Sequence, residues 1–311
     1  MTKVSISIPF YNVYSNEQGE SWARQCIRSV LDQTHEEFEL ILIDDGSTDE
    51  TIELLSEYTD DGRTRLIKQE NRGFPGARNR GIEEGEGDYY AFIGQDDLWD
   101  SKKLERQIAY LESTDDDIVH TNALHIDENG EIIGRRHNDD PPLQTHRKMF
   151  IRELFMHSFI CIQSVLANTK VFEEHRFDES LSINCDHELW LRLAGEFNFG
   201  YMPDEIVYKR FHGSNVSGRY ETLFEERKCM IEKMVKRYPF LGDLRNQKLS
   251  QVYLTYAVRL IVDGEVDRGR KALRQSITYN GMNWKAFATY VLSLAGPTIG
   301  GEVVNRLSKP P

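Results

Sequence analysis

Cysteine is scarce in this chain of 311 residues, and its spacing excludes several classes of protein. The cysteines are scattered and form no C-x-x-C pair, so we expect neither a disulfide framework nor a zinc site of ordinary spacing. Reduced thiols of this kind are typical of a cytosolic protein. The four cysteines are Cys26, Cys161, Cys185 and Cys229.

Long apolar runs are also lacking. No uncharged apolar run reaches the roughly 18 residues that suggest a membrane-spanning helix. The nearest is Trp284 to Ala295, which Lys285 interrupts and Gly296-Pro297 ends. The opening residues, MTKVSISIPFYN, have the pattern of a strand and lack the apolar segment of a signal peptide. We therefore expect no ordinary spanning helix.

Basic residues are outnumbered. The chain has 38 Lys and Arg against 51 Asp and Glu, a formal net charge of −13. This balance argues against nucleic acid as the main partner, because binding a phosphate backbone needs a basic field. A small phosphate-bearing ligand remains compatible with it, since a few local arginines and a divalent cation can hold such a ligand.

What the chain does contain, over its first 120 residues, is a regular alternation of strand and helix patterns. Apolar runs such as VSISIP (4–9) and ELILID (39–44) alternate with segments of helical spacing such as 21–33 and 75–85. Such alternation predicts an α/β fold with a mostly parallel sheet and helices on both of its faces.

The pattern changes twice further along the chain. After residue 120 it loosens into a hairpin signal at Asn129-Gly130, short extended pieces and one clear helix, DHELWLRLAGEF. From 219 it is helical almost throughout, with breaks at proline and glycine. We therefore expect an α/β domain over 1–218 and a C-terminal helical region over 219–311.

Polar side chains follow the strand ends that such a sheet brings to one edge, where ligands of open parallel sheets bind. An aromatic ring, several carboxylates and two arginines at this edge suit a nucleobase, phosphates and Mg²⁺ or Mn²⁺. Each group also has a plain structural explanation as a turn residue, a helix cap or core filler. Four coincidences at successive strand ends are less expected than one site. The ends carry Pro9 to Asn12, Asp44 to Ser47, Asn71 to Asn79 and Gly94 to Asp97.

The same residues carry a family resemblance. The stretches VSISIPFYN, SVLDQTHEEFELILIDDGSTDET, NRGFPGARNRGI and GDYYAFIGQDDLW occur in order over about the first 100 residues. In them the chain resembles the inverting glycosyltransferases of family 2. CDHELWLRLA looks like the family's acidic segment with the catalytic base, and RFHGSNVS looks like its late histidine segment.

The resemblance implies a GT-A fold, which is Rossmann-like with a mostly parallel mixed sheet, and a division of labour within 1–218. Residues 1–120 would bind the nucleotide sugar, and residues 121–218 would supply the acceptor site and the catalytic base. The C-terminal helical region lies outside the resemblance.

The resemblance also implies roles for single residues in donor binding. Tyr11 would stack on the nucleobase, and the backbone near Pro9 would line its pocket. Asp45 would accept a hydrogen bond from the base edge. Arg78 would reach the ribose or a phosphate, and Asp96 would bind the ribose or lie in the shell of a metal.

Three further residues would carry the chemistry. Asp97 would ligate the divalent cation, Mn²⁺ or Mg²⁺, and His212 is a second candidate ligand. A lone histidine in a Gly-Ser-Asn loop is otherwise simply exposed or hydrogen-bonding. Asp186 would be the general base, although a carboxylate opening a helix is also a good N-cap.

The chain departs from the family pattern at two positions. Gly94 stands where the first acidic residue of the D-x-D region is often found, which leaves Asp96 and Asp97 to suffice. Cys185 stands where an acidic residue often precedes the base. It is either a small packing residue or a reactive thiol.

The function implied is transfer of a sugar from a nucleotide-diphosphate sugar, with UDP the favoured nucleotide, to a hydroxyl acceptor in glycan or polysaccharide synthesis. A catalytically weak sugar-nucleotide-binding protein is one alternative. A nucleotidyltransferase is another, but the segment FYNVYSNEQGE after the first strand is acidic and not glycine-rich.

The expected partners follow from this function. The acceptor would be a glycan or a lipid-linked molecule. Apolar residues in NWKAFATYVLSLAGPTIGGEVV would cover the catalytic domain, pack in a homodimer or lie on a membrane surface at the inner face of the cell membrane. Packing within the protein is the default among these alternatives.

Overall fold

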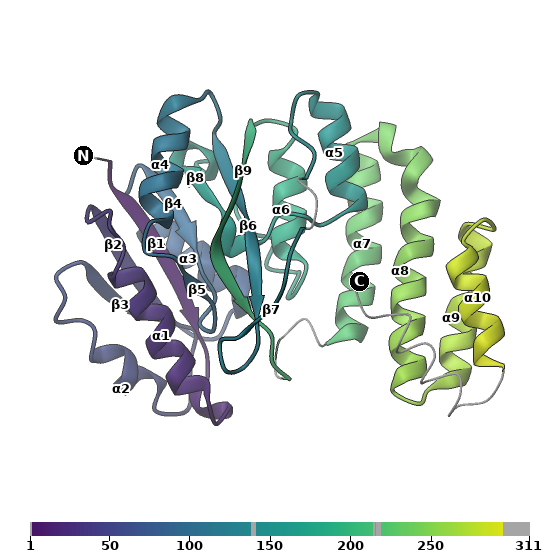
Figure 1. Ribbon diagram of the computed structural model, residues 1–311, viewed down its shortest axis with the longest axis horizontal. Coiled ribbons are helices and arrows are strands. Elements are labelled where there is room, and N and C mark those ends of the chain that lie inside the picture. The colour runs from purple at the N-terminus through teal and green to yellow at the C-terminus, as the bar shows by residue number, and fades with distance from the viewer. Residues whose placement is uncertain (1, 138–140, 214, 216–218, 295–311) are drawn as a thin grey trace. The chain divides into compact units, whose positions relative to one another are not determined.

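A computed structural model describes residues 2–137, 141–213, 215 and 219–294 (Figure 1). The chain divides into two compact units, Met1–Asn215 and Val216–Pro311. The strands of the first unit are β1 (Val4–Phe10), β2 (Phe38–Asp44), β3 (Thr64–Lys68), β4 (Tyr89–Phe92), β5 (Leu98–Trp99), β6 (Ile118–Ile126), β7 (Ile132–Arg135), β8 (Leu166–Asn168) and β9 (Phe199–Arg210). Its α-helices are α1 (Gly19–Leu31), α2 (Thr51–Ser56), α3 (Gly73–Glu84), α4 (Lys103–Ser113), α5 (Arg147–Met156) and α6 (Cys185–Leu193).

The strands form one mixed sheet in the order β3-β2-β1-β4-β8-β6-β9-β5, and β7 pairs with the last residues of β6. The first four strands along the chain, β1 to β4, are parallel where they pair. β8 runs antiparallel to both β4 and β6, and β6 is parallel to β9. The predicted α/β fold with a mostly parallel mixed sheet is confirmed, and the carboxyl ends of β1, β2 and β4 open on one edge.

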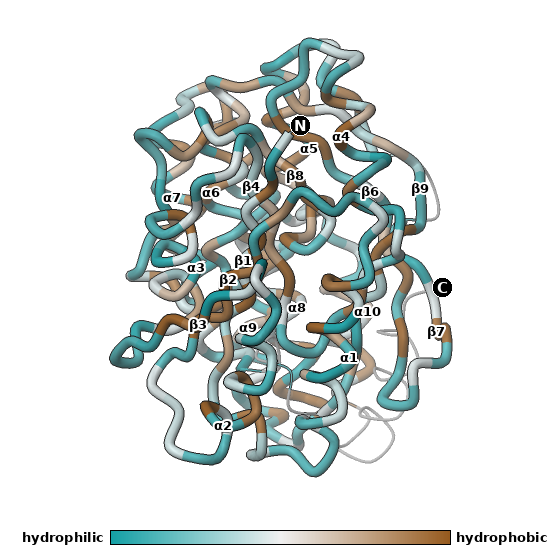
Figure 2. Tube along the Cα trace, turned by 90° about the vertical axis from the view of Figure 1, so that its left-hand side faces the viewer, coloured by the Kyte–Doolittle hydropathy of each residue, from teal (hydrophilic) through white to brown (hydrophobic). Residues whose placement is uncertain are grey.

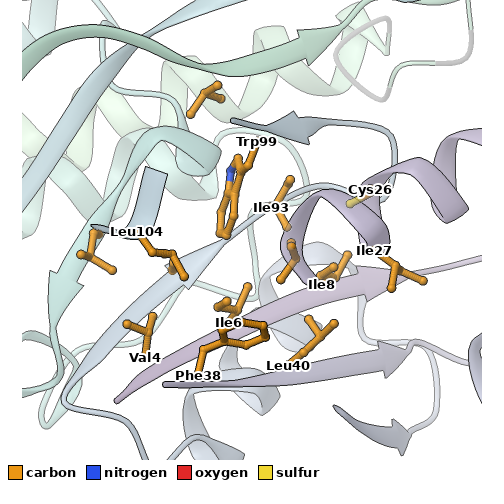
Figure 3. Packing of buried hydrophobic residues seen from close by; sticks show 14 of the residues in the cluster. Val4, Ile6, Ile8, Cys26, Ile27, Phe38, Leu40, Ile93, Trp99 and Leu104 are labelled. Atoms are coloured by element: carbon orange, nitrogen blue, oxygen red, sulfur yellow. The ribbon is translucent and has the colours of Figure 1, made fainter. Parts of the chain in front are cut away.

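The core of this unit lies along the central strands. All seven residues of β1 and of β2 are buried, and Figure 2 shows stretches of these strands in the brown of hydrophobic residues. The helix α1 adds Trp22, Cys26, Ile27 and Val30, because apolar residues recur at helical spacing on one face. Figure 3 shows Cys26 and Ile27 of this helix among Ile6 and Ile8 of β1 and Ile93, the residue after β4.

Three elements differ from the sequence prediction. The two extended pieces predicted around 199–212 are one long strand, β9, which continues through Pro203. The strand β5 is two residues long and exists through its pairing with β9, so no local pattern predicts it. The helix α5 was also not predicted, since it lacks a side-chain cap and an acidic first turn.

The second unit, Val216–Pro311, is helical in its described residues. It contains α7 (Tyr220–Arg237), a short 3₁₀ turn (Pro239–Leu241), α8 (Gly242–Val262), α9 (Val266–Tyr279) and α10 (Trp284–Ser293). The predicted breaks at Pro239, Gly264 and Asn280-Gly281 all fall between these helices. Residues 295–311 of the predicted helical region lie outside the described residues.

The pair α8 and α9 packs closely at Gly269. A Cβ atom there would lie 2.5 Å from Cγ1 of Ile261 and 3.1 Å from the carbonyl oxygen of Ala257. Gly264, with φ of +88°, makes the turn between the two helices. Among the described residues, no helix of either unit is long and apolar enough to cross a membrane.

Candidate active site

The ends of β1 and β2 are tied together by side chain to backbone hydrogen bonds. Asn12, in the left-handed conformation with φ of 45°, donates its backbone N–H to Ser47 Oγ at 3.0 Å. Its side-chain Oδ1 accepts from the Thr48 backbone N–H at 2.8 Å. The neighbouring Tyr11 donates its backbone N–H to Gln95 Oε1 in the loop after β4. Three strand ends are thereby joined, and the Tyr11 side chain stays 45% exposed beside them.

Pro9 and Asp45 lie deeper at the same edge. Pro9 is buried in β1 opposite Ile43. The buried Asp45 carboxylate accepts hydrogen bonds at Oδ1 from Gln69 Nε2 at 2.6 Å and from the Arg72 backbone N–H at 2.9 Å. Burial raises the pKa of Asp45, although the hydrogen bonds from Arg72 and Gln69 act to lower it. Asp45 therefore fastens the start of α3 to the end of β2.

Arg78 lies buried on α3 with its guanidinium near two aromatic rings, 5.7 Å from the ring centre of Phe74 and 5.5 Å from that of Phe177. Its Nη1 donates to Sγ of Cys185 at 3.6 Å. Its Nε is buried, and no hydrogen-bond partner for it lies among the described residues. A buried cation with an unused donor is a suitable group for an anionic or ribose-bearing ligand.

The two aspartates of the GQDD segment face different partners. Asp97 is buried, and its Oδ1 accepts from the Arg210 backbone N–H at 2.9 Å. Asp96 is partly exposed, and its Oδ2 lies 2.8 Å from Nε2 of His212 and 3.3 Å from Nδ2 of Asn215. Burial, and then the negative charge of Asp96, raises the pKa of Asp97.

Gly94 adjoins both carboxylates. A Cβ atom at this position would lie 3.0 Å from Oδ1 of Asp96 and 3.1 Å from Oδ2 of Asp97. Its carbonyl oxygen accepts a hydrogen bond from the buried thiol of Cys26 on α1. Any side chain at 94 would start within contact distance of the acidic pair.

Arg210 holds this segment in place, and sequence reasoning missed it. The side chain is 1% exposed. Its Nε donates to the carbonyl oxygen of Asp96 at 3.0 Å, and its Nη1 donates to the carbonyl oxygens of Asp127 and Glu128. Its Nη2 donates to Gln25 Oε1 on α1. The only signal in the sequence is an arginine two residues before the histidine in RFHGSN, and nothing local distinguishes it from an exposed arginine.

Trp22 completes the support of His212. The two ring centres lie 4.5 Å apart, and the Arg210 guanidinium lies 5.4 Å from the Trp22 ring. The indole Nε1 of Trp22 donates to the carbonyl oxygen of Glu128. The imidazole is therefore held by an aromatic contact as well as by Asp96.

Asp186 lies in the first turn of α6 and is partly buried. Its Oδ1 accepts from the backbone N–H of His187 at 2.8 Å, a local contact. His187 is buried, with Nε2 2.7 Å from the carbonyl oxygen of Leu154 on α5. Cys185 is also buried, and its Sγ accepts a hydrogen bond from Arg78. Burial of the thiol favours a packing role for Cys185 over that of a reactive thiol.

The structure brings predicted residues of the site together in two groups. The end of β4 joins Asp96 and Asp97 to β9 through Arg210 and His212. In the other group, Arg78 on α3 donates a hydrogen bond to Cys185 on α6, the residue next to Asp186. The described residues contain no cluster of three or more His, Cys, Asp or Glu side chains that could hold a metal ion. Asp96 Oδ2 and His212 Nε2 lie 2.8 Å apart, the distance of a hydrogen bond, and a cation bound by both atoms would take the place of the proton between them.

Comparison with known proteins gives three findings. The sequence profile described as Glycosyl transferase family 2 matches residues 5–176. An "Uncharacterized glycosyltransferase" of Rickettsia felis is 34% identical over 216 residues, which cover 68% of this chain and 33% of that protein. The "Chondroitin synthase" of Escherichia coli is 28% identical over 69% of this chain and 30% of that protein. The chain thus spans about a third of the length of these relatives.

Solved structures support the fold. TarS 1–349 of S. aureus in complex with UDP-GlcNAc has a TM-score of 0.61 at 14% identity, covering 98% of this chain and 91% of that one. The mannosyltransferase PcManGT of Pyrobaculum calidifontis, in complex with GDP-Man and Mn²⁺, has a TM-score of 0.61 at 12% identity, covering 99% and 79%. At these identities the likeness shows the fold alone.

Proposed function

Because this chain belongs to glycosyltransferase family 2, we propose that it transfers a sugar, with inversion, from a UDP-sugar to a hydroxyl acceptor in glycan or polysaccharide synthesis. The observation that carries the proposal is the contact between Asp96 Oδ2 and His212 Nε2. It joins residues 116 positions apart at the ligand-binding edge of the sheet. Relatives in complex with UDP-GlcNAc or GDP-Man support a nucleotide-sugar donor.

The donor nucleotide would lie along the ends of β1 and β2. The exposed ring of Tyr11 is available for stacking on the base, and the backbone at Pro9 borders the same position. Asp45 holds the loop that receives the base and is the proposed acceptor for its N–H group. Arg78 is the proposed partner of the ribose or a phosphate through its guanidinium, although its Nε is buried.

We propose that Asp96 and His212 hold a divalent cation, Mn²⁺ or Mg²⁺, and that Asp97, which the resemblance gives as the ligand, supports them. The Asp97 carboxylate is buried and bonded to the backbone of β9, whereas Asp96 and His212 face each other. When bound, the cation supplies Lewis-acid stabilisation of the diphosphate charge. Asp97 acts by holding the turn that carries Asp96.

Asp186 is the proposed general base. An acceptor hydroxyl attacks the anomeric carbon on the face opposite the diphosphate, so the new C–O bond forms as the bond to the β-phosphate oxygen breaks. The carboxylate of Asp186 takes the hydroxyl proton, and general-base catalysis of this kind raises the rate by about 10²–10⁴-fold. The nucleoside diphosphate leaves with the bonding electrons, and the configuration at the anomeric carbon inverts.

A thermal-shift screen of nucleotide sugars, with and without Mn²⁺, tests donor binding. A true donor raises the free energy of unfolding by about 2.7 kcal/mol at a hundred times its Kd. Product analysis then separates the alternatives. Release of nucleoside diphosphate supports sugar transfer, release of pyrophosphate supports a nucleotidyltransferase, and binding with neither product supports a protein that only binds the sugar nucleotide.

A further inference from the structure

The last described helix, α10, is oriented with its small side chains inward and its large apolar side chains outward. Ala286, Thr289 and Ser293 are the buried residues of this helix. Its exposed apolar residues recur at spacings of three and four, which places them on one face. The exposed fractions of Trp284 and Phe287 are 70% and 61%. The α10 face comprises Trp284, Phe287 and Val291 of the helix and Leu294, the residue after it.

An outward apolar face of this kind is unusual for a helix of a monomeric globular protein, where the large apolar residues normally pack inward. The α10 helix itself contains no acidic residue. Packing against α8 and α9 uses the small residues and Tyr290, since Ala286 shares a core cluster with Ala257, Ile261 and Leu273, and Tyr290 packs against it. The large residues of the α10 face are therefore not needed for the folding of this unit.

Basic side chains flank the α10 face. The guanidinium of Arg274, on α9, donates to the hydroxyl of Tyr290 at 3.1 and 2.9 Å. The ammonium of Lys285 lies 6.0 Å from the ring centre of Trp284. Lys271 is exposed on α9. Within the described part of the chain, none of these three cations forms an ion pair.

The two units carry opposite charge. Residues 1–215 contain 22 Lys and Arg against 42 Asp and Glu, a net charge of −20, whereas residues 216–311 contain 16 against 9, a net charge of +7. The unit that exposes the α10 face is therefore the basic one. An anionic surface attracts this unit, and a second copy of the same basic unit is repelled by it.

We propose that the α10 face docks on a bilayer surface that contains anionic phospholipid. The helix would lie in the plane of the interface, with its apolar side chains among the acyl chains and its flanking cations at the headgroups. The arrangement of a tryptophan and a lysine at the start of the helix is typical of this interface. The proposal does not depend on the proposed sugar transfer, because docking needs neither donor nor acceptor.

The test is flotation of the full chain, without nucleotide, on two kinds of vesicle. One kind is phosphatidylcholine alone, and the other is phosphatidylcholine mixed with phosphatidylglycerol. We expect the protein to float with the mixed vesicles and to be released by high salt. Phe287→Glu should lower the vesicle partition at least about tenfold, because it places a charge where the docked helix would bury an apolar ring in the bilayer. Lys285→Glu should lower it by roughly fivefold or more.

Val262→Glu is the matched control, since Val262 is also an exposed apolar residue of this unit but lies on α8 outside the α10 face. It adds the same charge and should leave the partition within about twofold of the parent. Melting temperatures of all variants check that they fold. Equal partition of Phe287→Glu and the parent overturns the proposal. Failure of the parent protein to bind the anionic vesicles also overturns it. The same conclusion follows if the parent is a dimer that binds no lipid and Phe287→Glu converts it to a monomer.

Discussion

The two halves of the candidate site differ in how completely their polar atoms are paired before any ligand binds. Around GQDD, the carboxylates of Asp96 and Asp97 and the guanidinium of Arg210 all have hydrogen-bond partners. Around α3 and α6, Arg78 contacts a thiol and two aromatic rings, and its Nε has no partner among the described residues. The first half therefore holds its charged groups in fixed positions through hydrogen bonds. The second half retains a polar atom without a partner among the described residues.

The largest effect should come from the second half. Asp186→Asn keeps the size of the side chain but removes the base, so we expect turnover to fall about 10²–10⁴-fold. Affinity for the donor nucleotide, measured by calorimetry, should change less than about twofold, because nucleotide binding is assigned to other residues. Near-normal turnover would remove Asp186 from its role, and a matching loss of nucleotide affinity would mean that the two halves are not separable.

In the first half, Arg210→Met should mainly lower stability. The substitution removes the donor to four oxygen atoms, two of them on the exposed residues Gln25 and Glu128, so we expect the free energy of unfolding to fall by about 2 kcal/mol. Denaturant unfolding measures this loss. Activity of the folded fraction should also respond less to Mn²⁺, since Asp96 loses its backbone support. A variant as stable as the parent would show that the GQDD turn does not need this side chain.

The pair Asp96→Asn and Asp97→Asn distinguishes the two aspartates. Asp96→Asn should lower the apparent affinity for Mn²⁺ in donor binding at least about tenfold. Substituting only the hydrogen-bond partner of a metal ligand already lowers metal affinity by about that factor. Asp97→Asn should keep the cation response and lower the melting temperature instead. Titration of Mn²⁺ at fixed donor gives the comparison. The reverse ranking would restore Asp97 as the ligand and remove the present assignment.

The smallest effect should come from Gly94→Ala. The added Cβ meets two carboxylate oxygens at 3.0 and 3.1 Å, which must move by a few tenths of an ångström. Because alanine also reduces the freedom of the unfolded chain by about 0.4–1 kcal/mol, we expect stability within about 1 kcal/mol of the parent. The apparent affinity for Mn²⁺ should change by only a few fold. An abolished cation response would show that the glycine is essential to the acidic pair.

The fold was largely predictable from sequence because its signals are local. Buried strands such as Val4–Phe10 are apolar runs, and the breaks at Pro239 and Gly264 follow from the backbone chemistry of those residues. The elements that were missed depend on distant partners. The two residues of β5 form a strand because they pair with Tyr208 and Val207 of β9.

The residue types of the candidate site were determined by the sequence alone, since the spacing of strand ends brings Tyr11, Asp45 and the GQDD segment to one edge. Which of the adjacent aspartates turns toward His212 was decided only in three dimensions. Successive residues of a turn point in different directions, and the direction that is buried depends on β9, more than 100 positions away in the chain. The same holds for Arg210, because an arginine is buried where distant oxygen atoms accept hydrogen bonds from its guanidinium.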